Sequence, residues 1–125
     1  MKLTREHFEK ASDEELREWV AEYVMGMVEQ YVEGQFGGAY VFVVGEPDGN
    51  WISKENIPHY STDIAAAWQV VDKMTGKNLG WKLYNTTDNN IGCHFEVKPN
   101  SGEGVWATAD TAPRAICKAA LLAMV

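Results

Sequence analysis

Residues 60–68, with the sequence Tyr-Ser-Thr-Asp-Ile-Ala-Ala-Ala-Trp, decide the fold class because they predict where a helix begins. Ser61 and Thr62 are residue types that cap helices, and Asp63 puts an acid in the first turn, where the helix dipole favours it. Apolar residues follow at helical spacing, and Gly76 is typical of a helix end. We expect a helix over about residues 62–74. The residues expected on its buried face are Ile64, Ala67, Trp68, Val71 and Met74.

Two further helices are predicted on either side of this one. Ser12 and Glu15 have the spacing of a capping box, and an apolar stripe with three- and four-residue steps follows until Gly26. Residues 4–10 are compatible with a short helical turn before it. The last helix should begin near Asp110 or Thr111, with Pro113 in its first turn, where proline is tolerated.

The strands predicted by alternation are grouped in the second half of the chain. Residues 79–84, 91–97 and 104–108 alternate between apolar and polar or small side chains, which predicts a three-stranded meander. Residues 39–44 predict one more strand. No regular pattern covers residues 28–38, and residues 51–60 are expected to be a loop. The order of elements favours a single α+β domain over residues 1–125, with an antiparallel sheet between helices in an α-β-α sandwich.

Charge divides the chain into two halves and excludes one class of partner. Residues 1–62 hold twelve acids and five bases, a net charge of −7, whereas residues 63–125 hold six of each. A protein that binds long nucleic acids needs a basic face, so such a partner is not expected. No run approaches the ~18 apolar residues of a membrane span, and the charged N-terminus is unlike a signal peptide. We therefore expect a cytoplasmic protein.

The start of the last helix is the best candidate site. The first backbone N–H groups of a helix have no partner within it, and together with the dipole they favour phosphate. Arg114 lies in this first turn, where a cation is disfavoured unless it meets an anion. We therefore nominate Asp110, Thr111 and Arg114 as ligand-binding residues. The alternative is that Arg114 is solvated or pairs with an acid such as Glu96.

A polar run at residues 84–90 is the second candidate. Tyr84 offers a ring on which a base can stack, and the amides of Asn89 and Asn90 can hydrogen-bond a base edge or a ribose. The alternative is ordinary turn chemistry, because Asn and Asp favour tight bends.

The tryptophans and cysteines predict core residues more than chemistry. Trp19 and Trp68 lie on apolar helix faces and are expected in the core, while Trp81 and Trp106 are expected in the core, at a subunit interface or as a stacking wall. We expect Cys93 and Cys117 to be buried thiols, and their separation in space stays open.

Catalytic and metal-binding motifs are not apparent. Cys93 and His94 are neighbours on a strand and point to opposite faces, so they cannot chelate together. No zinc or iron motif and no nucleophile–base set is visible. We expect no metal, no cofactor and no enzymatic activity.

Three segments of the sequence resemble those of a phage-encoded family. Residues 60–68, together with LREWVAEYVMG at 16–26 and DTAPRAICKAAL at 110–121, are similar to segments of the phage ABA-sandwich family. This family places a sheet between two helix layers. Within it, the chain resembles the first type of Thoeris anti-defence protein.

The resemblance implies a function without chemistry. Such proteins act as sponges that bind glycocyclic ADP-ribose, a signal of host immunity, without degrading it, and some also bind cyclic oligonucleotides. It implies that Tyr84 and Asn90 contact the ADP-ribose signal and that Arg114 contributes an arginine. It further implies a homodimer or higher homo-oligomer in the host cytoplasm, with no membrane partner.

Two alternatives from other classes remain open. A small protein-interaction module that inhibits a host protein would use an apolar or acidic patch near the first helix, and the charge of residues 1–62 is its support. A hydrolase of cyclic nucleotides would need a metal and would form a product.

Overall fold

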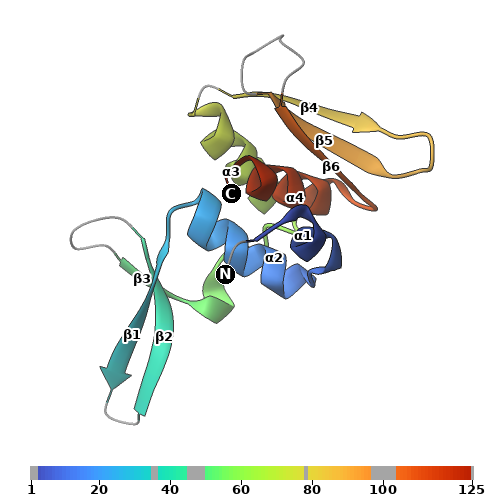
Figure 1. The fold of residues 1–125 in the computed structure, drawn as a ribbon. Helices are drawn as coiled ribbons and strands as arrows, with labels where there is room; N and C mark the ends of the chain where they lie inside the picture. Colours follow the sequence, from blue (N-terminus) through green and yellow to red (C-terminus); the bar gives the residue numbers. More distant parts are fainter. Residues whose placement is uncertain (1–2, 35–36, 45–49, 78, 97–103, 125) are drawn as a thin grey trace.

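Helix α3 (Ile64–Thr75) begins within the stretch that predicted it (Figure 1). The structure is a computed structural model that describes residues 3–34, 37–44, 50–77, 79–96 and 104–124. Its N-cap is Asp63, whose Oδ1 accepts a hydrogen bond from the Ala65 backbone N–H at 3.1 Å. Gly76 is the C-cap, as expected. The aspartate thus supplies the oxygen that the sequence analysis assigned to Ser61 or Thr62.

The buried face of α3 is rotated from the predicted one. Ala67, Val71 and Met74 are buried as expected, but Ile64 and Trp68 are 44% and 39% exposed, so their prediction as buried residues was wrong. Trp68 lies at the edge of the interface, where its ring meets that of Trp81 edge-on at 5.4 Å between centroids. The face that is covered also contains Ala66 and Val70.

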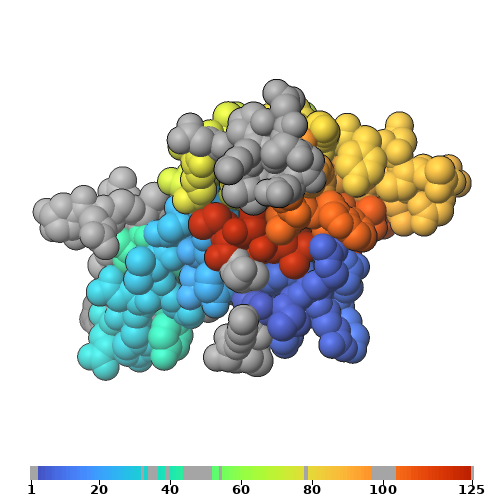
Figure 2. Space-filling view, turned by 45° about the horizontal axis from the view of Figure 1, so that its top comes forward, coloured from blue at the N-terminus to red at the C-terminus, as the bar shows by residue number. Residues whose placement is uncertain are grey.

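Helix α4 (Ala112–Met124) is the most enclosed element of the fold. Its residues from Ala115 to Leu121 are all buried, and most of them are alanine or other small residues that allow neighbouring backbones to approach closely. The helix contacts strands β5 and β6, helix α3 and the N-terminal helices. Figure 2 shows α4 in red between the orange strands and the blue N-terminal helices.

The predicted meander is confirmed as an antiparallel sheet of β4 (Gly80–Asn85), β5 (Ile91–Glu96) and β6 (Gly104–Ala109). One face lies against α3 and α4 and buries the side chains of Cys93, Phe95, Ala107 and Ala109. The other face presents Lys82, His94 and Trp106, which stand next to one another in the register.

A second antiparallel sheet lies on the far side of the helices (Figure 1). It contains β1 (Val28–Gly34), β2 (Gly37–Val44) and β3 (Asn50–Ser53), followed by the 3-10 turn η2 (Lys54–Asn56). Only β2 was predicted, and the expectation of a loop at residues 51–60 was wrong for β3. Strands β1 and β3 depend on pairing with β2 and not on an alternating pattern of their own. The pairing of β1 with β2 places Tyr31 opposite Tyr40. The proline, glycine, asparagine and aspartate residues within 46–50 and 99–102 also predict turns, but apart from Asn50, which begins β3, these ranges lie outside the described residues.

The N-terminal segment folds into α1 (Arg5–Lys10), α2 (Asp13–Trp19) and a π-helical turn, η1 (Val20–Val24). The predicted capping box is present, because the Glu15 N–H donates to Ser12 Oγ and the Ser12 N–H donates to Glu15 Oε1, both at 3.1 Å. Gly26 has a φ of +76°, which favours glycine and ends the helical path. The α+β class is therefore confirmed. No described helix is long and apolar enough to cross a membrane.

Arg17 ties α2 to the chain that enters α3. It is only 4% exposed, and its guanidinium donates to the carbonyl of Ile57 from Nε at 3.1 Å and from an Nη at 2.6 Å, and to the carbonyl of Glu55 at 2.8 Å. Glu14 completes the set at 3.2 Å, although it is largely exposed. The two carbonyls thus depend on one buried cation.

Replacing this cation should destabilise the fold while removing its exposed partner should not. We expect Arg17→Met to lower the free energy of unfolding by about 2–3 kcal/mol, because buried carbonyls lose charged donors. Glu14→Gln should change it by less than about 0.5 kcal/mol, as is usual for exposed ion pairs. Urea unfolding followed by circular dichroism measures both, and equal effects would contradict this role of Arg17.

Candidate functional site

Three of the predicted site residues meet in one hollow at the start of α4. The hollow has a volume of about 350 Å³. Asp110, Thr111 and Arg114 line it, as predicted, and residues from two other elements complete it. The added residues are Asp13, Ser61 and Thr62.

The starts of three helices converge on this hollow. Asp13 is the first residue of α2, Ser61 and Thr62 come just before the cap of α3, and Thr111 comes just before α4. The carbonyl of Thr111 accepts the Ala115 N–H at 3.1 Å, as the carbonyl of an N-cap residue does. Helix starts carry partial positive charge, so their convergence favours a negatively charged group.

Arg114 already holds an anion of the protein itself. It donates to Asp13 Oδ1 and to the carbonyl of Ala11, each at 2.5 Å. Arg114 therefore has an acidic partner, as the alternative expected, but this partner is Asp13. Glu96 pairs instead with Lys82, at 2.9 Å. A ligand phosphate would have to displace the Asp13 carboxylate or bind beside it.

A second, smaller hollow lies beside the same helix start. It has a volume of about 240 Å³ and is lined by Leu83, Tyr84, Asn85, Ile91 and Ala112. Tyr84 is 42% exposed, and its ring lies so close to Gly92 that a Cβ there would come within 2.4 Å of ring atoms. Ala112 follows Thr111 directly, so the two hollows flank one point of the chain.

Asn89 and Asn90 form the turn between β4 and β5 and line neither hollow. Asn89 has a φ of +65°, which asparagine tolerates, and the carbonyl of Asn90 accepts the Thr86 N–H at 2.9 Å. Turn chemistry therefore accounts for the conformation of these two residues. Asn85, which the sequence analysis passed over, lies within the same polar run and lines the hollow beside Tyr84.

Sequence reasoning missed three of the lining residues for two reasons. Ser61 and Thr62 were interpreted as caps of α3, and their place just before the helix is what brings them into the hollow. Asp13 is 101 residues from Arg114, and no pattern in the sequence links the two.

The two cysteines are buried, and Cys93 and His94 lie on opposite faces of β5, as the sequence predicted. Cys93 is fully buried against the helices, while His94 is on the opposite face of β5, with Nδ1 3.9 Å from Glu96 Oε1. Cys117 is also buried, and both thiols are free. Among the described residues, no three His, Cys, Asp or Glu side chains form a group suited to a metal ion.

Trp106 and Trp81 lie on opposite faces of the sheet. Trp106 is on the face away from α3 and α4, where the Arg5 guanidinium stands 4.5 Å from its ring centroid. Trp81 contacts Trp68 of α3. Trp19, predicted in the core, is half-buried and meets Phe8 edge-on at 5.6 Å.

Comparison with known families decides the identity at the level of the domain. The family model for the phage ABA sandwich domain matches residues 18–121, which is most of the chain. The chain belongs to this family. The matched segment contains every residue that lines the two hollows of the phage ABA sandwich domain, except Asp13. No curated protein and no solved structure matches the chain.

The buried thiols and Tyr60 of this phage ABA sandwich domain should make its stability depend on pH. Burial raises the pKa of Cys93 from 9.0 to about 12, raises that of Cys117, and raises that of Tyr60 from 10.0 to about 12. The unfolded chain therefore loses these protons at lower pH than the folded chain. Their contribution to stability is complete below pH 9 and is lost as pH rises from 9 towards 12.

Urea unfolding between pH 7 and 11 tests this dependence. We expect the midpoint to fall above pH 9, and the double variant Cys93→Ala, Cys117→Ala to show a smaller fall. A midpoint that stays level to pH 11 would contradict the burial of these groups.

Proposed function

We propose that this phage ABA sandwich domain binds and sequesters a nucleotide-derived immune signal of the glycocyclic ADP-ribose type, without degrading it, and so suppresses Thoeris immunity. The observation that carries the proposal is the pair of hollows at the start of α4. One is lined by polar residues and an arginine beside three helix starts, and the other is lined by Tyr84, Asn85 and apolar residues.

The two hollows suit the two ends of such a ligand. The pyrophosphate is negatively charged and would be favoured by the starts of α3 and α4 and by Arg114. The base is flat and aromatic and would stack on Tyr84, whose ring lies over Gly92, while Asn85 is the next residue of β4 and faces the other side of the sheet. Asn90 stays a candidate contact that would require the β4–β5 turn to close over the ligand.

Competition between the ligand and Asp13 is a specific consequence of this geometry. Arg114 is held by the Asp13 carboxylate in the absence of ligand. A signal with two phosphates can offer Arg114 a stronger partner than one carboxylate. The remaining arginines are engaged elsewhere, because Arg17 holds backbone carbonyls and Arg5 lies over Trp106. The proposal therefore names the ADP-ribose signal before cyclic oligonucleotides.

Enclosure of the ligand is the reason to propose a homo-oligomer. Volumes of about 350 and 240 Å³ lie near or below the lower end of the range of ~300–1,000 Å³ for ligand pockets. A sponge competes with a receptor and needs to cover its ligand, and a second copy of the chain can supply that cover. The half-exposed Ile64, Trp68 and Trp81 support such an interface.

Release of intact ligand by heat tests sequestration directly. The purified protein is incubated with glycocyclic ADP-ribose and filtered, and the retained fraction is heated and assayed by mass spectrometry. We expect the signal to stay with the protein and to be released unchanged. An altered product would indicate an enzyme, and free signal in the first filtrate would reject this ligand.

Variants test the site rather than the ligand. Arg114→Ala and Tyr84→Ala should each weaken binding about tenfold or more, since each removes a principal contact. Asp13→Asn should strengthen it, because Arg114 loses its internal competitor, a gain that a damaged fold would not produce. Lys73→Ala, on the exposed side of α3, is the control. Unchanged binding in both weakening variants would place the site elsewhere.

A further inference from the structure

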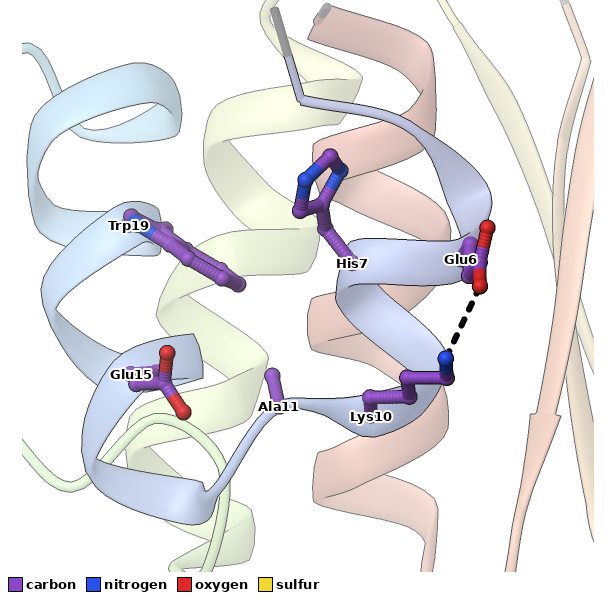
Figure 3. Close-up of a pocket in the computed structure, with 6 residues that line it drawn as sticks. All are labelled: Glu6, His7, Lys10, Ala11, Glu15 and Trp19. Carbon is purple, nitrogen blue, oxygen red and sulfur yellow. Dashed lines mark hydrogen bonds and ion pairs between the residues drawn. The ribbon is translucent and has the colours of Figure 1, made fainter. Parts of the chain in front are cut away.

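A third hollow, between α1 and α2, has chemistry opposite to that of the site at α4. It has a volume of about 390 Å³ and is the largest of the hollows described here. Figure 3 shows Trp19 and Glu15 of α2 on one side, His7 and Ala11 between the helices, and Glu6 joined to Lys10 on the other side of α1. They are Glu6, His7, Lys10, Ala11, Glu15 and Trp19. Five of the six precede the segment that the family model matches.

The charged groups of this hollow favour a cation. Glu6 and Glu15 contribute two carboxylates against the single ammonium of Lys10. Lys10 pairs with Glu6 at 2.8 Å, but both side chains are about three-quarters exposed, and such pairs hold little free energy. Glu15 accepts the Ser12 N–H through Oε1, and a carboxylate can accept several further hydrogen bonds.

Three other acids of the same helices pair with cations from within the fold. Glu9 pairs with Lys118 at 3.0 Å, Asp13 pairs with Arg114, and Glu14 pairs with Arg17. Glu6 and Glu15 differ from them in lining an open hollow. Part of the negative charge of residues 1–62 is therefore exposed in this hollow, through Glu6 and Glu15.

Trp19 gives the hollow an aromatic wall. Its ring is held by an edge-on contact with Phe8 at 5.6 Å, so it does not have to be ordered when a ligand arrives. A guanidinium that stacks on an indole and hydrogen-bonds a carboxylate uses both features of this hollow. The chain contains the first half of this arrangement elsewhere, where Arg5 lies 4.5 Å above the Trp106 ring.

We propose that this hollow is a docking site for an arginine side chain in a basic segment of a partner protein. The arginine stacks on Trp19 and donates to Glu15, while Glu6 and the other acids of α1 and α2 attract the basic residues next to it. The site is separate from the hollows at α4 and does not depend on their ligand.

A peptide titration followed by NMR tests the site. The probe is a peptide of three arginine–glycine repeats, and the signal is the indole N–H of Trp19, assigned by its loss in Trp19→Phe. We expect this resonance to shift with saturation, and a glutamine–glycine peptide of equal length to leave it unchanged. We also expect the arginine peptide to bind about tenfold tighter than free argininamide, since neighbouring charges add to the attraction.

A matched pair of variants separates the local carboxylate from long-range charge. Glu15→Gln should weaken the arginine peptide about tenfold while keeping the capping box, which glutamine also forms. Glu22→Gln, an equal change of charge on the exposed side of η1, should have less than a twofold effect.

Four outcomes would overturn the proposal. They are no shift of the Trp19 resonance at millimolar peptide, an equal shift with the glutamine peptide, equal loss in the two variants, and argininamide binding as tightly as the peptide. The last would indicate a site for a small cation rather than a protein partner.

Discussion

The burial of α4 is the constraint on which the rest of the structure depends. A helix enclosed on nearly every side must have small residues at its contacts and must find partners for any charge it carries. Its run of alanines meets the first requirement. Arg114 and Lys118 meet the second by pairing with Asp13 and Glu9 of the N-terminal helices. These two ion pairs bring the first fifteen residues of the chain against the last fifteen.

The candidate site follows from this arrangement. Because α2 is drawn to the start of α4 by the pairing of Asp13 with Arg114, and because α3 begins beside them, three helix starts share one polar hollow. The last strand of the meander ends at Ala109, just before α4, and Tyr84 and Ile91 line a second hollow together with Ala112. The proposed binding site thus shares its residues with the contacts that hold the fold together, and the Asp13 carboxylate stands where a ligand anion would be favoured.

Local signals in the sequence predicted the parts of the fold that depend on neighbouring residues. The starts of α3 and α4, the capping box at Ser12 and the meander follow from caps and periodicity within ten to fifteen residues. The buried face of α3 was predicted less well. Trp68 packs its ring against Trp81 of β4 at the edge of the contact between helix and sheet, and not inside that contact.

Long-range contacts explain what the sequence did not reveal. Strands β1 and β3 are stabilised by pairing with β2, and β3 is only four residues long. The partner of Arg114 comes from the opposite end of the chain. The sequence could therefore predict an acidic partner, but it could not predict that the acid is Asp13. Asn89 and Asn90 show why such predictions are ambiguous, because residues suited to bind a nucleotide are equally suited to turn a chain.

The central claim, that the start of α4 holds a nucleotide-derived anion, is tested most directly by hydrogen exchange of the protein with and without saturating glycocyclic ADP-ribose. The account predicts slower exchange in peptides that contain residues 61–65, 84–91 and 111–116, with no change in β1 and β2. Protection confined to α1 and α2, or spread evenly over the chain, would contradict it.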